Sequence, residues 1–122
     1  MSAEGALLEG GWVLEGTDGA GRRVRLAIAD RELAREELGI TVGRHPALCE
    51  RLIEDQTVSR RHMRLGLDRG RLAIEDLNSL NGTLLGGREV PRFRPVPLHA
   101  GQELVLGAVR LHVARLRSET GG

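Results

Sequence analysis

Apolar and polar residues alternate in several short runs along the chain. The runs 23–28 and 63–67 both place an apolar side chain at every second position. A period of two is typical of a strand that buries one face. Asp18-Gly19 lies in a glycine-rich connector between the first of these runs and the stretch that starts at Gly11, and it predicts a hairpin there.

Further short apolar runs are bounded by turn residues. Gly86-Gly87 and Gly107-Ala108 predict two more hairpin turns. Many short strands with frequent turn signals, and no convincing long helix, predict an all-β sandwich or barrel. We expect these further strands at 40–42, 71–77, 84–85, 104–106 and 109–113.

Three segments fit no single pattern. Residues 30–38 begin with an aspartate that can cap a helix and end before Gly39, so they predict either a marginal helix or a surface loop with one turn. Residues 47–57 are too short and irregular to classify. Three prolines in 90–98 predict an extended connection or an edge strand, because proline cannot donate to a sheet ladder.

Polar clusters lie at the ends of three predicted strands. Gly43-Arg44 follow one strand, the run 59–62 (Ser-Arg-Arg-His) precedes another, and the run 78–83 (Asn-Ser-Leu-Asn-Gly-Thr) joins two more. Asparagine tolerates positive φ, serine bonds nearby backbone, and glycine adopts positive φ without steric cost, so 78–83 is a tight turn. Three polar loops at one edge of a sheet predict one site.

Composition limits the class of protein. At 122 residues the chain is long enough for one domain with its own core. One cysteine, Cys49, excludes an internal disulfide framework and a four-cysteine metal site. The sequence contains no apolar run of transmembrane length and no signal sequence at its start, so we expect a cytoplasmic protein that does not enter a membrane.

The charge balance argues against binding to nucleic acid through the overall field. The net charge is +1, from 18 basic and 17 acidic residues. The aromatic residues are only Trp12 and Phe93, too few for a platform on which bases stack. All the basic residues are arginine, as a genome rich in G and C would produce, but arginine also matches phosphate with a planar fork of donors.

The ordered set of motifs resembles the forkhead-associated (FHA) domain. Gly43-Arg44, then 59–62, then 78–83 carry the resemblance, and 55–58 and 98–107 add to it. The likeness covers roughly 11–116, with a flexible lead-in over 1–10 and a flexible tail over 117–122. It implies a two-sheet antiparallel β-sandwich whose loops at one end bind phosphothreonine in a partner protein.

Five residues are assigned to the ligand by the resemblance. Arg44 matches the arginine that engages the phosphate, and Ser59 the serine that donates to it through its hydroxyl and backbone amide. Arg60 is expected to reach phosphate oxygens or the peptide backbone. Asn81 matches the asparagine that bonds the peptide main chain. Leu80 departs from members with a threonine or another polar residue there, which removes a hydroxyl contact but leaves a backbone amide for the phosphate.

Other residues are expected to shape the site rather than touch the ligand. His62 matches a histidine that holds the loops in place. A catalytic pair of Ser59 with His62 is disfavoured, because no acidic orienter or oxyanion motif accompanies it. Arg61 is expected to be a solvated neighbour. The full set of expected site-shaping residues is Gly43, His62, Ser79, Gly82 and Thr83.

These assignments predict recognition without chemistry and without a cofactor. The expected partner is a phosphothreonine protein, with a Ser/Thr kinase upstream and selectivity set by Gln56, Thr57 and Leu80. The alternative is an FHA scaffold whose phosphate site is idle and whose sheet face binds a partner. A metal site of His45 and Cys49 with a further histidine is a weak alternative.

A self-interaction is a further hypothesis. Thr17, Ser118 and Thr120 lie in a predicted turn and in the tail, where we expect them to be exposed. Phosphorylated there, they would be ligands for the chain's own site or for that of another copy.

Overall fold

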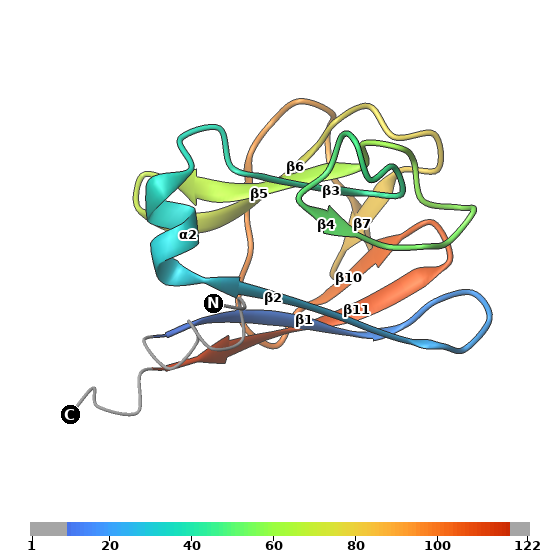
Figure 1. Ribbon diagram of the computed structural model, residues 1–122, viewed down its shortest axis with the longest axis horizontal. Helices are drawn as coiled ribbons and strands as arrows, with labels where there is room; N and C mark the ends of the chain where they lie inside the picture. The colour runs from blue at the N-terminus through green and yellow to red at the C-terminus, as the bar shows by residue number, and fades with distance from the viewer. Residues whose placement is uncertain (1–9, 118–122) are drawn as a thin grey trace.

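Two β-sheets face each other in the computed structural model, which describes residues 10–117 (Figure 1). The first sheet has the order β2-β1-β11-β10-β7-β8, with bounds β1 Gly11–Thr17, β2 Arg23–Ala29, β7 Thr83–Leu85, β8 Arg88–Glu89, β10 Glu103–Leu106 and β11 Val109–Leu116. The second has the order β4-β3-β5-β6-β9, with bounds β3 Ile40–Gly43, β4 Arg51–Leu52, β5 Met63–Asp68, β6 Arg71–Asp76 and β9 Val96–Pro97.

The expected antiparallel sandwich is confirmed, with one exception. Every neighbouring pair of strands is antiparallel except β3 and β4, which pair in parallel through Val42 with Arg51 and Gly43 with Leu52. The hairpins predicted around Asp18-Gly19, Gly86-Gly87 and Gly107-Ala108 join β1 to β2, β7 to β8 and β10 to β11.

The core lies between the two sheets and follows from the alternation. In β11, Val109, Leu111 and Val113 are buried while Arg110 and His112 are exposed. Each buried aliphatic side chain of this size contributes roughly 1.5–3 kcal/mol relative to an exposed one. The largest fully buried aliphatic side chains come from both sheets and the loops between them: Leu14, Ile28, Ile40, Ile53, Met63, Leu65, Ile74, Leu98, Leu104, Leu106 and Leu111.

The segment 30–38 forms a short helix, α2 (Asp30–Arg35), so the helical alternative is the one observed. Glu32 stabilises its start by accepting a hydrogen bond from the Ala29 amide at 3.0 Å. Arg51 of β4 pairs with Glu32 at 2.6 Å and donates to the Ala27 carbonyl of β2 at 3.1 Å. The helix therefore ties an edge strand of the first sheet to one of the second.

Residues 47–57 contain the two-residue strand β4, and 90–98 contain β9 at the edge of the second sheet, as the prolines predicted. The expected lead-in and tail lie outside the described residues, apart from two positions. Gly10 is buried and accepts a hydrogen bond from the Asp30 amide, and Arg117 is exposed. In the described part of the chain, no helix is long and apolar enough to cross a membrane.

The loops that carry the polar clusters meet at one end of the sandwich, on the right of Figure 1. They follow β3, precede β5 and join β6 to β7. Backbone hydrogen bonds link them, from Arg44 to the Ser59 carbonyl at 3.0 Å and from His62 to the Val42 carbonyl at 2.9 Å. The sheets thus hold the three clusters together.

Candidate functional site

The turn between β6 and β7 is organised by Asp76, which the sequence analysis did not single out. Its carboxylate accepts hydrogen bonds from the amides of Asn78 and Ser79, both at 2.9 Å, and from the hydroxyls of Ser79 at 2.7 Å and Thr83 at 2.6 Å. Asp76 is 1% exposed. Aspartate often accepts a hydrogen bond from the backbone amide two residues ahead and so favours a turn. The position of Asp76 two residues before Asn78 was the sequence signal that could have identified it.

The charge of Asp76 is stabilised by these contacts. Burial alone would raise the pKa of Asp76, but the hydrogen bonds from Thr83 and Ser79 outweigh it and lower the pKa. Arg92 adds a contact from outside the turn, donating to the Ser79 carbonyl at 3.1 Å. The turn is therefore fixed before any ligand arrives.

His62 joins two of the loops from a fully buried position. Its Nδ1 accepts the Ser59 amide hydrogen at 3.0 Å, and its Nε2 lies 2.9 Å from the Gly82 carbonyl oxygen. Because Nδ1 is an acceptor, the proton is on Nε2 and the ring is neutral. Burial lowers the pKa of His62, although the Gly82 carbonyl and Asp76 act in the opposite direction. Both ring nitrogens are thus engaged, and neither is placed to take a proton from the Ser59 hydroxyl.

The backbone amides that we expected to serve the phosphate are engaged within the loops. The Ser59 amide donates to His62, and the Leu80 amide donates to the Ser59 Oγ at 2.9 Å. This differs from the expectation because the loops are close enough to satisfy each other's donors. The second contact uses Ser59 Oγ as an acceptor, so its hydroxyl proton remains to donate elsewhere.

Arg44 is placed by the close packing of the end of β3. A Cβ atom at Gly43 would lie 2.2 Å from the Arg60 carbonyl oxygen, so only glycine fits where β3 meets the Ser59–His62 loop. Arg44, which follows, is half-buried and donates from Nε to the Val58 carbonyl at 3.0 Å. Its two terminal nitrogens have no hydrogen-bond acceptor among the described residues and can meet an anion as a fork.

Thr57 connects the second sheet's loops to the first sheet. Its carbonyl accepts from the Asn81 side-chain amide at 2.8 Å, and its hydroxyl accepts from the Ala108 amide at 2.8 Å. Asp55 accepts from the Thr57 hydroxyl and, at 2.8 Å, from the amides of Thr57 and Gly19. The hydrogen bond from the Thr57 hydroxyl is the largest of the effects that lower the pKa of Asp55.

These loops border an open depression of about 350 Å³. All five residues assigned to phosphate or peptide line its wall, and Arg61, expected to be merely solvated, lines it too. None of the lining residues is acidic. The complete lining is Arg44, Gln56, Thr57, Val58, Ser59, Arg60, Arg61, Leu80 and Asn81.

The residues expected to shape the site lie behind this wall. Ser79 and Thr83 are buried on Asp76, and His62 spans the loops. Gly82 has φ +80°, a conformation that favours glycine, and its carbonyl faces His62. They belong to the support of the depression rather than to its surface.

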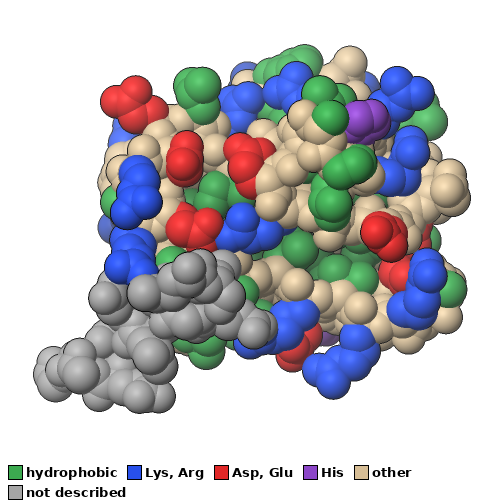
Figure 2. Space-filling model, in the orientation of Figure 1, with side chains coloured by type: hydrophobic (Ala, Val, Ile, Leu, Met, Phe, Trp, Pro, Cys, Tyr) green, Lys and Arg blue, Asp and Glu red, His purple; other side chains and the backbone are tan. Residues whose placement is uncertain are grey.

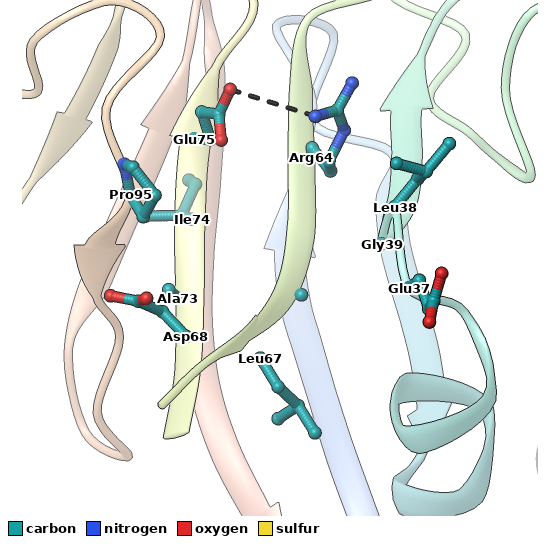
Figure 3. Close-up of a pocket in the computed structure, with 11 residues that line it drawn as sticks. Glu37, Leu38, Gly39, Arg64, Leu67, Asp68, Ala73, Ile74, Glu75 and Pro95 are labelled. Carbon is teal, nitrogen blue, oxygen red and sulfur yellow. Dashed lines mark ion pairs between the residues drawn. The ribbon is translucent and has the colours of Figure 1, made fainter. Parts of the chain in front are cut away.

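A smaller hollow of about 160 Å³ lies on the outer face of the second sheet (Figure 3). Arg64 and Glu75 point toward each other across its rim, with 3.8 Å between Nη1 and Oε2, and Leu38 is 79% exposed beside it. It contains none of the residues in the three polar clusters. In the part of the chain that the structure describes, no three His, Cys, Asp or Glu side chains gather as metal ligands.

Charges of both signs are interspersed over the face of the molecule seen in Figure 2. Among the described residues, several arginines are paired with acidic residues, such as Arg22 with Asp18 at 2.8 Å and Arg51 with Glu32. The arginines of the depression differ from these because they have no carboxylate in the wall beside them.

Comparison with known proteins gives one consistent family. A family model described as the FHA domain matches residues 40–107. An oxoglutarate dehydrogenase inhibitor of Corynebacterium efficiens is 42% identical over 71 residues, which make up 58% of this chain and 47% of that protein. A glycogen accumulation regulator, GarA, of Mycolicibacterium smegmatis is 37% identical over 71 residues, 58% of this chain and 42% of that one. The chain spans about half the length of these curated relatives.

Solved structures agree on the fold. The FHA domain of an Arabidopsis thaliana hypothetical protein superposes with a TM-score of 0.69 at 25% identity, covering 94% of this chain and 93% of that one. A structure from a study of phosphothreonine-dependent FHA domain interactions gives a TM-score of 0.62 at 28% identity, covering 85% and 95%.

Proposed function

The chain belongs to the FHA domain family, and on that premise we propose that the depression binds phosphothreonine in a partner protein and catalyses no reaction on it. One observation carries the proposal. The half-buried Arg44 guanidinium and the Ser59 hydroxyl border a depression that has three arginines and no carboxylate in its wall. A phosphate with two negative charges and three acceptor oxygens matches this set of donors.

Arg44 and Ser59 are the proposed primary phosphate ligands. The bond from Arg44 Nε to the Val58 carbonyl fixes the guanidinium plane, so the terminal nitrogens approach the phosphate with little loss of rotamer freedom. A charge-assisted hydrogen bond of this kind contributes about 1.5–3 kcal/mol. Ser59 donates its remaining hydroxyl proton, and the exposed Arg60 supplies a further charge from the rim.

Asn81 and Leu80 are proposed to meet the peptide beside the phosphothreonine. Asn81 is exposed and its Nδ2 is engaged by Thr57, so its Oδ1 is the atom that can accept a main-chain N–H of the peptide. Leu80 is 86% exposed and offers an apolar surface, since its amide already bonds Ser59. Together with Gln56 and Thr57 in the same wall, it is the proposed source of selectivity.

The proposed partner is a protein phosphorylated by a Ser/Thr kinase, met in the cytoplasm, without a cofactor. The printed names of two relatives, an inhibitor and a regulator, fit a protein that acts by binding another protein. Affinity near micromolar, about −8 kcal/mol, is expected for a short peptide that orders on binding.

Fluorescence polarisation with degenerate peptide pools tests the proposal. Pools carrying phosphothreonine, phosphoserine or unmodified threonine are titrated with wild type, Arg44→Ala and Ser59→Ala. Arg71→Ala is the matched control. Arg71 is exposed at the start of β6, and Asp76, which organises the turn beside the depression, lies at the other end of that strand. We expect binding to the phosphothreonine pool alone, weakened at least about tenfold by the first two substitutions and unchanged by the third. If no pool binds to the folded protein, the site is idle and the alternative of phosphate-independent partner binding takes its place.

A further inference from the structure

The depression carries more positive charge than one phosphothreonine neutralises. Arg44, Arg60 and Arg61 bring three positive charges to its wall, and no lining residue is acidic. A phosphothreonine brings about −1.5 to −2 at neutral pH. About one positive charge at the rim therefore remains without a counter-charge once the proposed ligand is bound.

Two carboxylates close to these loops, Asp55 and Asp76, do not supply that counter-charge. Asp55 is occupied by the Thr57 hydroxyl and by the amides of Thr57 and Gly19. Asp76 is buried under the turn and occupied by Ser79, Thr83 and the Asn78 amide. These donors lower the pKa of both carboxyl groups, and neither residue lines the depression.

Arg61 is the arginine left for a second negative group. Its side chain is exposed and forms no hydrogen bond or ion pair with the described residues, whereas Arg51 and Arg115 pair with Glu32 and Asp30. Arg44 is fixed on Val58 inside the depression and is assigned to the phosphate. An unpaired arginine at the rim attracts a carboxylate on the ligand and repels a basic side chain there.

We propose that Arg61 selects phosphopeptides that carry acidic residues next to the phosphothreonine. This inference rests on the proposed function and adds the class of ligand to it. The partner segment is therefore an acidic one, with glutamate or aspartate on at least one side of the phosphorylated threonine. Because the contact is exposed, it sets preference among phosphopeptides rather than binding itself.

Three synthetic peptides of equal length test the inference. Each holds a central phosphothreonine; one has neutral residues on both sides, one has three glutamates before it and one has three glutamates after it. They are titrated at 50 mM and 500 mM NaCl against wild type, Arg61→Gln and the control Arg71→Gln. We expect at least one acidic peptide to bind wild type about threefold to fivefold more tightly than the neutral one at 50 mM NaCl. This preference should fall below about twofold in Arg61→Gln and at 500 mM NaCl, and persist in Arg71→Gln.

The outcomes separate this inference from the function on which it rests. Neutral and acidic phosphopeptides that bind wild type equally would overturn the role of Arg61 and leave phosphothreonine binding intact. A preference that survives in Arg61→Gln would also overturn it and assign the selection to Arg60. If none of the phosphopeptides binds, the proposed function fails and this inference fails with it.

Discussion

At the scale of single residues, Asp76 gives the loops their shape. Its buried carboxylate accepts four hydrogen bonds from Asn78, Ser79 and Thr83, and the same turn presents Leu80 and Asn81 to the depression. Negative charge is tolerated there because the donors compensate for lost hydration. A depression lined by positive charge thus rests on a buried anion.

Asp76→Asn should therefore weaken both the fold and the site. The amide group would turn an NH₂ toward Ser79 or Thr83, leaving buried donors without an acceptor. We expect the free energy of unfolding to fall by about 2–4 kcal/mol in urea titrations, and phosphopeptide affinity to fall as well. Asp68→Asn, at the exposed end of β5, should change the stability by less than about 0.5 kcal/mol. Equal stability of the two variants would contradict this account.

His62 predicts a specific dependence of stability on pH. Burial lowers its pKa below the ordinary 6.5, so the unfolded chain takes up a proton at a higher pH than the folded protein does. The free energy of unfolding should therefore decline as the pH falls below 6.5, by up to about 1.4 kcal/mol per pH unit, until the folded pKa is reached. Buried carboxylates whose pKa is lowered contribute only near pH 4 and below.

Urea titrations at pH 7, 6 and 5 measure this slope. His62→Gln should flatten the slope, because the variant has no group at this position that titrates in the range. His112→Gln, exposed on β11, is the matched control and should keep the wild-type slope. A slope that is the same in all three proteins would show that His62 does not titrate differently in the two states.

At the scale of elements, the end of β3 must approach the Ser59–His62 loop closely. Gly43→Ala would place Cβ 2.2 Å from the Arg60 carbonyl oxygen, so β3 and the loop must move apart. We expect a loss of about 1–3 kcal/mol in unfolding free energy and at least a tenfold loss of phosphopeptide affinity, because Arg44 follows directly.

Gly86→Ala separates this effect from that of glycine replacement in general. Gly86 has φ +58° but no atom within 4 Å of a Cβ, and it lies in the β7–β8 hairpin. Its replacement should cost about 1–2 kcal/mol through backbone conformation and leave peptide affinity unchanged. Equal losses of affinity in both glycine variants would contradict the role given to the close approach.

The strands that the sequence predicts best are those whose faces differ. β5 and β11 alternate in burial, and their turns carry glycine, so pattern and turn chemistry agree. β2 alternates in sequence, but its last four residues, 26–29, are all buried. β4 and β9 have two residues each, and their pairing depends on β3 and β6 rather than on any local pattern.

The order of the motifs in the sequence located the loops of the site. It could not indicate that the Ser59 and Leu80 amides bond within those loops, nor that Arg61 lines the depression. Those facts depend on distances between segments far apart in the chain.

At the scale of the whole molecule, the site depends on both sheets. Thr57 binds Ala108 in the β10–β11 hairpin of the first sheet and Asn81 beside the second. A Cβ at Gly107 would lie 2.5 Å from the Thr57 carbonyl oxygen, so this contact also requires close packing. Loop geometry and global folding are therefore coupled.

Ligand binding should stabilise the whole fold in consequence. A phosphothreonine peptide at one hundred times its dissociation constant should raise the free energy of unfolding by about 2.7 kcal/mol in urea titrations. Arg44→Ala, with affinity tenfold lower, should gain only about 1.4 kcal/mol at the same peptide concentration. An equal gain in both proteins would place the peptide at some other surface.

The pairing of the first described strand with the last has a practical consequence. Gly11, at the start of β1, pairs with Leu116. The other end of β1 leads to Gly19, whose amide donates to Asp55 beside the depression. A host protein could therefore carry residues 11–116 as a cassette in one of its own surface loops, joined through two adjacent ends. The loops that border the depression would then face away from the host.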